Sequence, residues 1–163
     1  FDSTVDGINR RLAEGLELQH IAPLLPTASA AAPAGTGAGR YGRLPRQRTL
    51  GELAVDVKKM LSIAHVQIVG STDQAIEQVA VACGSGGEFL EAAERQGCQC
   101  LLTGEARFHT CLEAEALGRA MILVGHFASE RFGVEHLARV LGAQFAGIRV
   151  WPSRRERDPL VWL

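Results

Sequence analysis

Apolar positions in the second half of the chain alternate between short β-type runs and helical spacing, with a turn between them. The unit of strand, turn and helix occurs three times, which is typical of an α/β layer whose strands pair largely in parallel. The strands are predicted over 78–83, 99–102 and 120–124, the helices after them over 88–96, 106–118 and 129–142, and a last strand over 147–151.

The first half begins with a predicted helix. Ile8, Leu12 and Leu16 recur at four-residue spacing, and charged residues take the opposite face. We expect this helix over residues 6–18, with Asp6 as its N-cap.

A second helix is expected over residues 49–62, where Thr49 and Glu52 stand three apart, as in a capping box. Two extended segments are also predicted in this half. Residues 20–25 contain a proline and are expected at an edge of the sheet, and residues 65–70 form a β-type run.

The segment between residues 27 and 39 interrupts this pattern. It contains small residues, proline and glycine, which cannot build a core, so residues 27–39 are predicted to form a flexible surface loop. Four arginines follow within nine residues: Arg40, Arg43, Arg46 and Arg48. We interpret them as a solvated face beside a helix, with phosphate binding as the alternative.

The composition is that of a globular chain without a strong electrostatic preference for partners. Of its 163 residues, 47% are hydrophobic, and 17 basic against 18 acidic side chains leave a net charge of −1. This balance argues against bulk binding to nucleic acid or to an anionic membrane, and no apolar run approaches the about 18 residues of a transmembrane helix. We therefore expect one α/β domain over 1–163, with neither a membrane nor a nucleic acid as its partner.

The start of the chain and its cysteines indicate a reducing, cytoplasmic setting. The first residue is Phe1, and the segment after it lacks the basic start and apolar stretch of a signal peptide, so we expect that an upstream part is missing. Cys83, Cys98, Cys100 and Cys111 form no CxxC pair, and we interpret them as buried thiols rather than a zinc cluster. Cys98 and Cys100 are expected to point the same way from a strand.

Candidate chemistry lies in the turns after the predicted strands, where functional groups of α/β sheets collect. His126 and Glu130 stand four apart at the start of a predicted helix, so their side chains project to one side. An imidazole and a carboxylate in this arrangement suit a divalent cation. The alternative is a plain helix start, where Glu130 favours the helix dipole.

Two other turns offer weaker candidates. Glu105 and His109 also stand four apart after a strand, but taken alone they fit a helix start and an interface histidine better than a site. The turn "GSGG" at 84–87 either brings backbone N–H groups to an anion or forms a plain tight turn. We favour the tight turn, because no Lys-Ser/Thr follows as in a Walker A loop and the glycine spacing does not match the GxGxxG motif.

These three turns together resemble a known family. The segments "CGSGGEFLEAA", "LLTGEARFHT" and "ILVGHFASERFGVEHLA" are similar to the family of GTP cyclohydrolase 1 type 2 homologues, also called the Ngg-interacting-factor-three-like family. The first residues, "FDSTVDGINRRLAEGL", and the last, "RDPLVWL", are similar to it as well. The resemblance covers nearly the whole chain outside 27–39, and it implies a ring-shaped homo-oligomer, usually a hexamer.

The resemblance also implies a dinuclear metal site. The family's Asp, His and Glu ligands fall on Asp2, His126 and Glu130, and Glu130 would bridge the two ions as the catalytic carboxylate. The family's pair of adjacent histidines has no counterpart in this sequence, so we expect weak binding or a single ion. Glu105 and His109 are then expected to line the cleft and to bind substrate or carry a proton.

Two functions follow from the resemblance. The first is a hydrolase that depends on divalent ions (Zn, Mn, Fe or Mg) and acts on a nucleotide or a related phosphorylated heterocycle. The alternative is a metal-binding ring that serves as a scaffold or interaction protein without catalysis. Solvent access to the metal separates the two, because a hydrolytic site keeps an open coordination position.

Overall fold

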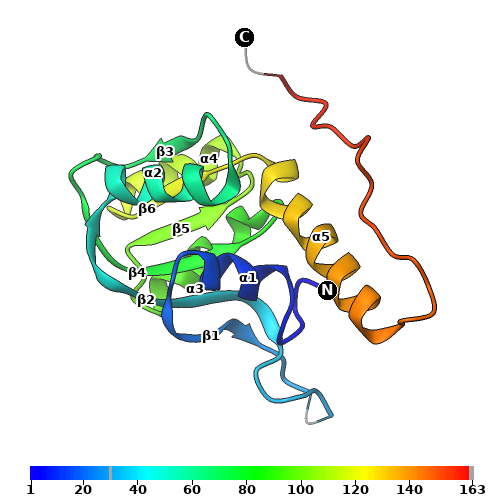
Figure 1. Ribbon diagram of the computed structural model, residues 1–163. Helices are drawn as coiled ribbons and strands as arrows, with labels where there is room; N and C mark the ends of the chain where they lie inside the picture. Colours follow the sequence, from blue (N-terminus) through cyan, green and yellow to red (C-terminus); the bar gives the residue numbers. More distant parts are fainter. Residues whose placement is uncertain (30, 162–163) are drawn as a thin grey trace.

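A mixed α/β arrangement is seen in the computed structural model, which describes residues 1–29 and 31–161. Within these residues, six strands form one sheet in the order β1-β2-β4-β5-β6-β3 (Figure 1). The strands are β1 (Gln19–Pro26), β2 (Gly37–Thr49), β3 (Gln67–Val69), β4 (Ala75–Ala82), β5 (Cys100–Thr103) and β6 (Ala120–Leu123). The helices are α1 (Ile8–Gly15), α2 (Leu50–Leu61), α3 (Leu90–Arg95), α4 (Phe108–Ala116) and α5 (His126–Gln144), with a 3₁₀ turn, η1 (Gly86–Phe89), before α3.

The strand, turn and helix repeat of the second half forms the centre of the sheet. Strands β4, β5 and β6 run parallel to one another, as the alternation predicted. The outer strands are antiparallel: β2 pairs with β4, β1 pairs with β2, and β3 pairs with β6. The α/β fold class is therefore confirmed, and parallel pairing is confined to the three central strands.

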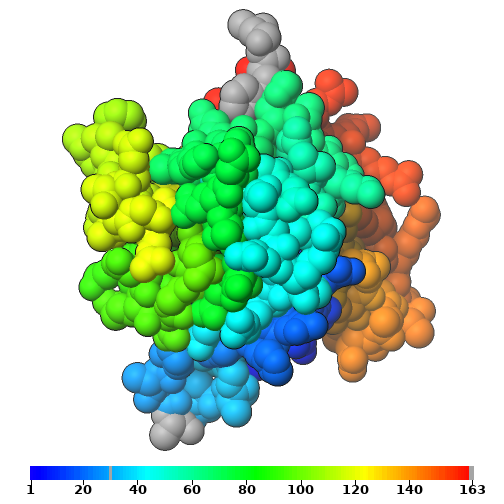
Figure 2. Space-filling model, turned by 90° about the vertical axis from the view of Figure 1, so that its left-hand side faces the viewer, coloured from blue at the N-terminus to red at the C-terminus, as the bar shows by residue number. Residues whose placement is uncertain are grey.

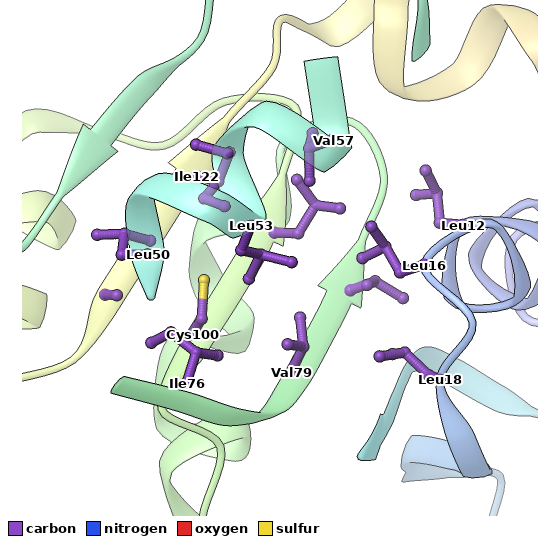
Figure 3. Packing of buried hydrophobic residues seen from close by; sticks show 14 of the residues in the cluster. Leu12, Leu16, Leu18, Leu50, Leu53, Val57, Ile76, Val79, Cys100 and Ile122 are labelled. Atoms are coloured by element: carbon purple, nitrogen blue, oxygen red, sulfur yellow. The ribbon is translucent and has the colours of Figure 1, made fainter. Parts of the chain in front are cut away.

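Side chains on the two faces of the sheet build two hydrophobic clusters. Val79 and Val81 of β4 face the cluster under α1 and α2, which is drawn in Figure 3. Ala80 and Ala82 face the opposite cluster, which includes residues of α3 and α4. This alternation of period two is the strand geometry that lets one short run serve both layers.

The starts of the first two helices differ in how they are capped. Thr49 accepts a hydrogen bond from the backbone N–H of Glu52, whose carboxylate accepts one from the Thr49 N–H, so the predicted capping box is present. The first helix begins at Ile8 rather than Asp6. Its N-cap is Gly7, which has no side chain to cap the helix, so the prediction of Asp6 as N-cap is wrong.

Strand β2 corrects the expected boundary of the surface loop. Residues 37–39, predicted as the end of the loop, are the first residues of β2. The segment before them projects from the body of the molecule (Figure 2) and closes with a hydrogen bond from the Thr27 N–H to the Thr36 carbonyl, 3.0 Å. The sequence of β2 is poor in β-branched residues, and its pairing with β1 and β4 on both sides overrides this weak local preference.

Arg40 also departs from its expected place. It was predicted to be part of a solvated face, yet it lies within β2 and is only 2% exposed. Its guanidinium donates to the carbonyls of Gly37 and Gly39, at 2.6 and 2.7 Å, and to that of Thr4 at 2.6 Å. A fourth carbonyl, that of Gly35, accepts at 3.3 Å. Arg40 is thus a buried clamp between β2 and the first residues of the chain.

Two further expectations are corrected. Residues 147–151, predicted as a strand, have no strand structure and pair with none of the six strands of the described sheet. Cys98 and Cys100 are both buried but belong to opposite clusters, since Cys98 precedes β5 instead of lying in it. Among the described residues, no helix is long and apolar enough to cross a membrane.

Candidate functional site

Two buried hydroxyl groups join the three turns that follow β4, β5 and β6. Ser129 Oγ accepts a hydrogen bond from the Gly84 N–H (2.9 Å) and donates to the His126 carbonyl (2.8 Å). Thr103 Oγ1 accepts from the Gly86 N–H (2.9 Å) and donates to the Gly84 carbonyl (3.2 Å). Both hydroxyl side chains are almost fully buried. The carboxyl ends of the parallel strands therefore form one cross-linked platform.

His126 lies on this platform between two carboxylates. Its Nδ1 is 2.9 Å from Glu105 Oε1, and its Nε2 is 3.4 Å from Glu130 Oε1. Glu105 also accepts a hydrogen bond from Ser85 Oγ at 2.5 Å, which fixes the carboxylate in front of the imidazole. The side chains of His126 and Glu130 are 49% and 38% exposed, so solvent reaches both.

Gly84 provides the close approach that this arrangement requires. Its φ is +64°, a left-handed conformation that glycine adopts without strain. A Cβ atom at this position would lie 2.6 Å from Glu130 Oε1 and 3.4 Å from His126 Nε2. The missing side chain leaves room directly in front of the two potential ligand atoms.

The N-terminal segment reaches the same end of the sheet. The N-terminus is drawn next to α5 in Figure 1. The Cβ of a side chain at Gly133, one turn beyond Glu130 on α5, would meet Ile8 of α1 and lie 3.6 Å from the ring of Phe1. Burial raises the pKa of the Cys83 thiol to about 12, and the negative charges of Asp2 and Glu130 add to the shift. The backbone of Asp2 lies beside the platform, because Asn9 donates to the Asp2 carbonyl (3.2 Å) and accepts from the Cys83 N–H (2.7 Å).

The five candidate residues do not all meet. His126, Glu130 and Glu105 are in contact with one another through the imidazole, although the sequence favoured a plain helix start for Glu105. The side chain of Asp2 is exposed, and among the described residues no group of three His, Cys, Asp or Glu side chains is arranged to hold a metal ion. His109 is exposed on α4 with its ring 6.2 Å from that of Phe108. Ser85, Ser129 and Thr103 were not predicted; their common signal is a small hydroxyl residue directly after or near a strand end.

A cleft of about 610 Å³ opens beside Glu105. Its polar lining consists of Ser85, Glu88, Glu105, Arg107 and Thr110. On the other side, His126 and Glu130 line a hollow of about 440 Å³ between α5 and the segment that ends at Leu160. The imidazole and its two carboxylates therefore stand between two solvent-filled spaces.

The titration of His126 tests this geometry. The hydrogen bond from Nδ1 to Glu105 raises the pKa of His126 above its ordinary value near 6.5, and the charge of Glu130 adds to this although partial burial opposes it. The interaction stabilises the fold fully below about pH 6.5, and the contribution is lost as pH rises through the higher folded pKa. In the metal-free protein, an NMR titration should place His126 above 6.5, and Glu105→Gln should lower it.

His136, further along α5, provides the internal comparison. Partial burial lowers its pKa, and the charges of Arg11 and Arg139 act in the same direction, so it should titrate below His126 in the same experiment. A His126 midpoint at or below that of His136, or no change in Glu105→Gln, would contradict the contact between His126 and Glu105.

Sequence comparison finds relatives that match most of this chain. The Duf34/NIF3 (NGG1p interacting factor 3) family profile matches residues 1–159. The GTP cyclohydrolase 1 type 2 homolog of Bacillus subtilis is 33% identical over 135 residues, which are 80% of this chain and 36% of that protein. The homolog from Nostoc is 34% identical over 143 residues, which are 86% of this chain and 52% of that protein.

A solved structure has the same fold as this chain. A hypothetical protein of Staphylococcus aureus superposes with a TM-score of 0.88 at 24% identity, over 99% of this chain and 66% of that one. The chain spans about a third of the length of the Bacillus subtilis relative and about half of the length of the Nostoc relative. Because the family profile covers it almost from end to end and the site turns lie within the matched residues, the chain belongs to the Duf34/NIF3 family.

Proposed function

We propose that this chain binds one divalent cation between His126 and Glu130 and that it acts in a metal-dependent hydrolase of nucleotides or related phosphorylated heterocycles. The observation that carries the proposal is the pair of facing atoms His126 Nε2 and Glu130 Oε1, 3.4 Å apart in the space left by Gly84. The proposal draws its substrate class from relatives that are named GTP cyclohydrolase 1 type 2 homologs.

The two facing atoms fit the donor set of a divalent ion. Zinc binds imidazole nitrogen and carboxylate oxygen at about 2.0–2.2 Å, so two ligands of a tetrahedral ion stand about 3.4 Å apart. Glu105 holds the proton of His126 on Nδ1, which leaves Nε2 as the free lone pair toward Glu130. Asp2 is the third proposed ligand, because its backbone already lies beside the platform.

Solvent access favours a reactive site over a closed structural one. His126 and Glu130 are both substantially exposed, and two or three protein ligands leave coordination positions for water or substrate. When bound, a divalent ion would supply Lewis acidity for hydrolysis. Glu130 is the proposed catalytic carboxylate, and Glu105 keeps the imidazole in the orientation and tautomer that ligation needs.

The cleft beside Glu105 is the proposed substrate-binding surface. Arg107 brings a guanidinium that matches phosphate oxygens, and Thr110 and Ser85 add hydroxyl groups. His109 lies on α4, the helix that carries Thr110, and would meet a substrate that extends past the cleft.

A second copy of the chain is the proposed partner for three exposed apolar residues of α5, Val134, Leu137 and Val140. The two copies would belong to a ring-shaped homo-oligomer, which sedimentation would detect.

Metal titration tests the cation site. Calorimetry with Zn²⁺ and Mn²⁺ should show one site per chain, and Glu130→Gln should weaken binding by at least about tenfold, because it removes an anionic ligand. Glu135→Gln is the matched control: Glu135 is exposed on the same helix and pairs with Arg131 at 3.6 Å. Equal affinity of the Glu130 variant and the wild-type chain would overturn the site.

Turnover tests the reaction separately. The metal-loaded chain should hydrolyse at least one member of a panel of nucleoside triphosphates and reduced or substituted heterocycle phosphates, and Glu130→Gln should abolish this activity. Metal binding that depends on Glu130, without turnover of any panel member, would overturn the hydrolase and support the scaffold alternative.

A further inference from the structure

Asn9 is a buried polar residue whose role the preceding site does not explain. It lies in the first turn of α1 and is 4% exposed. Both ends of its amide are used: Oδ1 accepts a hydrogen bond from the Cys83 N–H at 2.7 Å, and Nδ2 donates to the Asp2 carbonyl at 3.2 Å. A buried amide with both ends paired to backbone fixes the relative position of the two segments it joins.

The two segments that Asn9 joins are the two sides of the proposed site. Cys83 follows the last residue of β4 and precedes Gly84, which forms the wall in front of Glu130. Asp2 lies 81 positions before Cys83 in the sequence, so local structure cannot bring them together. The side chain of Asn9 spans this gap with one hydrogen bond on each side.

The other backbone contacts of the first residues lead toward β2. The Ser3 carbonyl accepts from the Gly37 N–H at 2.9 Å, and the Thr4 carbonyl accepts from Arg40 at 2.6 Å. These bonds hold residues 3 and 4 to the start of β2, where Arg40 is paired with Val81 of β4. Asn9 adds a direct hydrogen-bonded link between the backbone of residue 2 and Cys83 at the end of β4, where the site lies.

We propose that Asn9 is a positioning residue of the cation site, which holds the backbone of Asp2 at the β4 turn so that the Asp2 carboxylate can reach the ion. This inference rests on the proposed function, including Asp2 as a ligand. Without this bond, the backbone of residue 2 would have more freedom, and each binding event would then have to order it. A backbone fixed in advance leaves only the rotation of one exposed side chain.

Asn9→Asp removes one of the two hydrogen bonds and keeps the other, with little change in the shape of the side chain. An aspartate still accepts from the Cys83 N–H but cannot donate to the Asp2 carbonyl. Its added negative charge would strengthen cation binding through space, so a loss of affinity cannot come from electrostatics. We expect about tenfold weaker Zn²⁺ binding, the lower end of what positioning partners of metal ligands contribute.

A double-mutant cycle with Asp2→Asn distinguishes positioning from general stabilisation. Zn²⁺ affinity is measured with a competing chelator for the wild-type chain, Asn9→Asp, Asp2→Asn and the double variant, and urea unfolding is measured in EDTA for the same four. We expect Asn9→Asp to weaken binding only while Asp2 is present, whereas its effect on unfolding should be the same in both backgrounds. Asn9→Ala, which removes both bonds, replaces Asn9→Asp in the cycle if the aspartate variant does not fold.

The outcomes of the cycle separate the two proposals. Two results would overturn the role of Asn9 while the cation site stands, provided that Glu130→Gln weakens Zn²⁺ binding. In the first, Asn9→Asp leaves the Zn²⁺ affinity unchanged. In the second, Asn9→Asp lowers the affinity by the same factor in the Asp2→Asn background as in the wild-type chain. If Glu130→Gln has no effect, the proposed function fails and the role of Asn9 fails with it. Arg10→Gln, at a half-buried neighbour on α1 that pairs with Glu14, is the control and should leave the affinity unchanged.

Discussion

Replacing Arg40 with methionine is expected to lower the free energy of unfolding by about 3–5 kcal/mol, because several backbone carbonyls lose a buried charged donor together. The guanidinium is buried and donates to four backbone carbonyls, one in the first residues of the chain and three in residues 35–39. Methionine fills much of the volume but donates to none of them. The carbonyls of Thr4, Gly35 and Gly37 would then lose partners to which a charged donor contributes about 1.5–3 kcal/mol each, not additively.

Urea unfolding monitored by circular dichroism measures this loss, with Arg43→Met as the matched control. Arg43 lies in the same strand, is 60% exposed at its side chain and pairs with Glu77 at 2.9 Å. An exposed ion pair contributes about 0–1 kcal/mol, so the control should unfold close to the wild-type midpoint. If Arg40→Met lowers the free energy of unfolding by as little as the control does, water replaces the guanidinium as the hydrogen-bond donor to these carbonyls.

Arg40 also illustrates where sequence reasoning about the fold ends. The strands and helices from β4 to α5 could be predicted one by one, because their apolar runs carry the periods of strand and helix directly. Strand β2 carries no such signal, and its arginines suggested a solvated face. It becomes a strand because β1 and β4 pair with it on both sides, which is a property of the whole sheet. The run at 147–151 shows the converse, since β-type residues without a partner strand remain irregular.

The candidate site divides in the same way. His126 and Glu130 could be found from the sequence because four-residue spacing on a helix places two side chains together without any long-range information. The contact of His126 with Glu105 needs two parallel strands in register, which the alternating pattern only implied. Asn9 gave no signal of its own, since its partners lie 7 and 74 residues away and bind through backbone atoms that any residue type provides.

Gly84→Ala is expected to weaken divalent-cation binding by about 10–100-fold, the effect of displacing a group that positions a metal ligand. The new Cβ would lie 2.6 Å from Glu130 Oε1, and the carboxylate tip would have to move because the backbone at Gly84 is held by Ser129 and Thr103. Movement of this oxygen opens the 3.4 Å spacing to His126 Nε2 on which the site depends. The left-handed φ of +64° adds a backbone cost of about 1–2 kcal/mol to the loss of stability.

Gly97→Ala separates the close approach from the backbone strain. Gly97 also has a left-handed φ, +75°, but no atom lies within 4 Å of where its Cβ would be. Both variants should therefore lose a similar free energy of unfolding in EDTA, and only Gly84→Ala should lose affinity for Zn²⁺ or Mn²⁺ in calorimetry. If both variants bind the cation as the wild-type chain does, Glu130 can accommodate the methyl group without leaving the ion, and the space in front of Gly84 is not what forms the site.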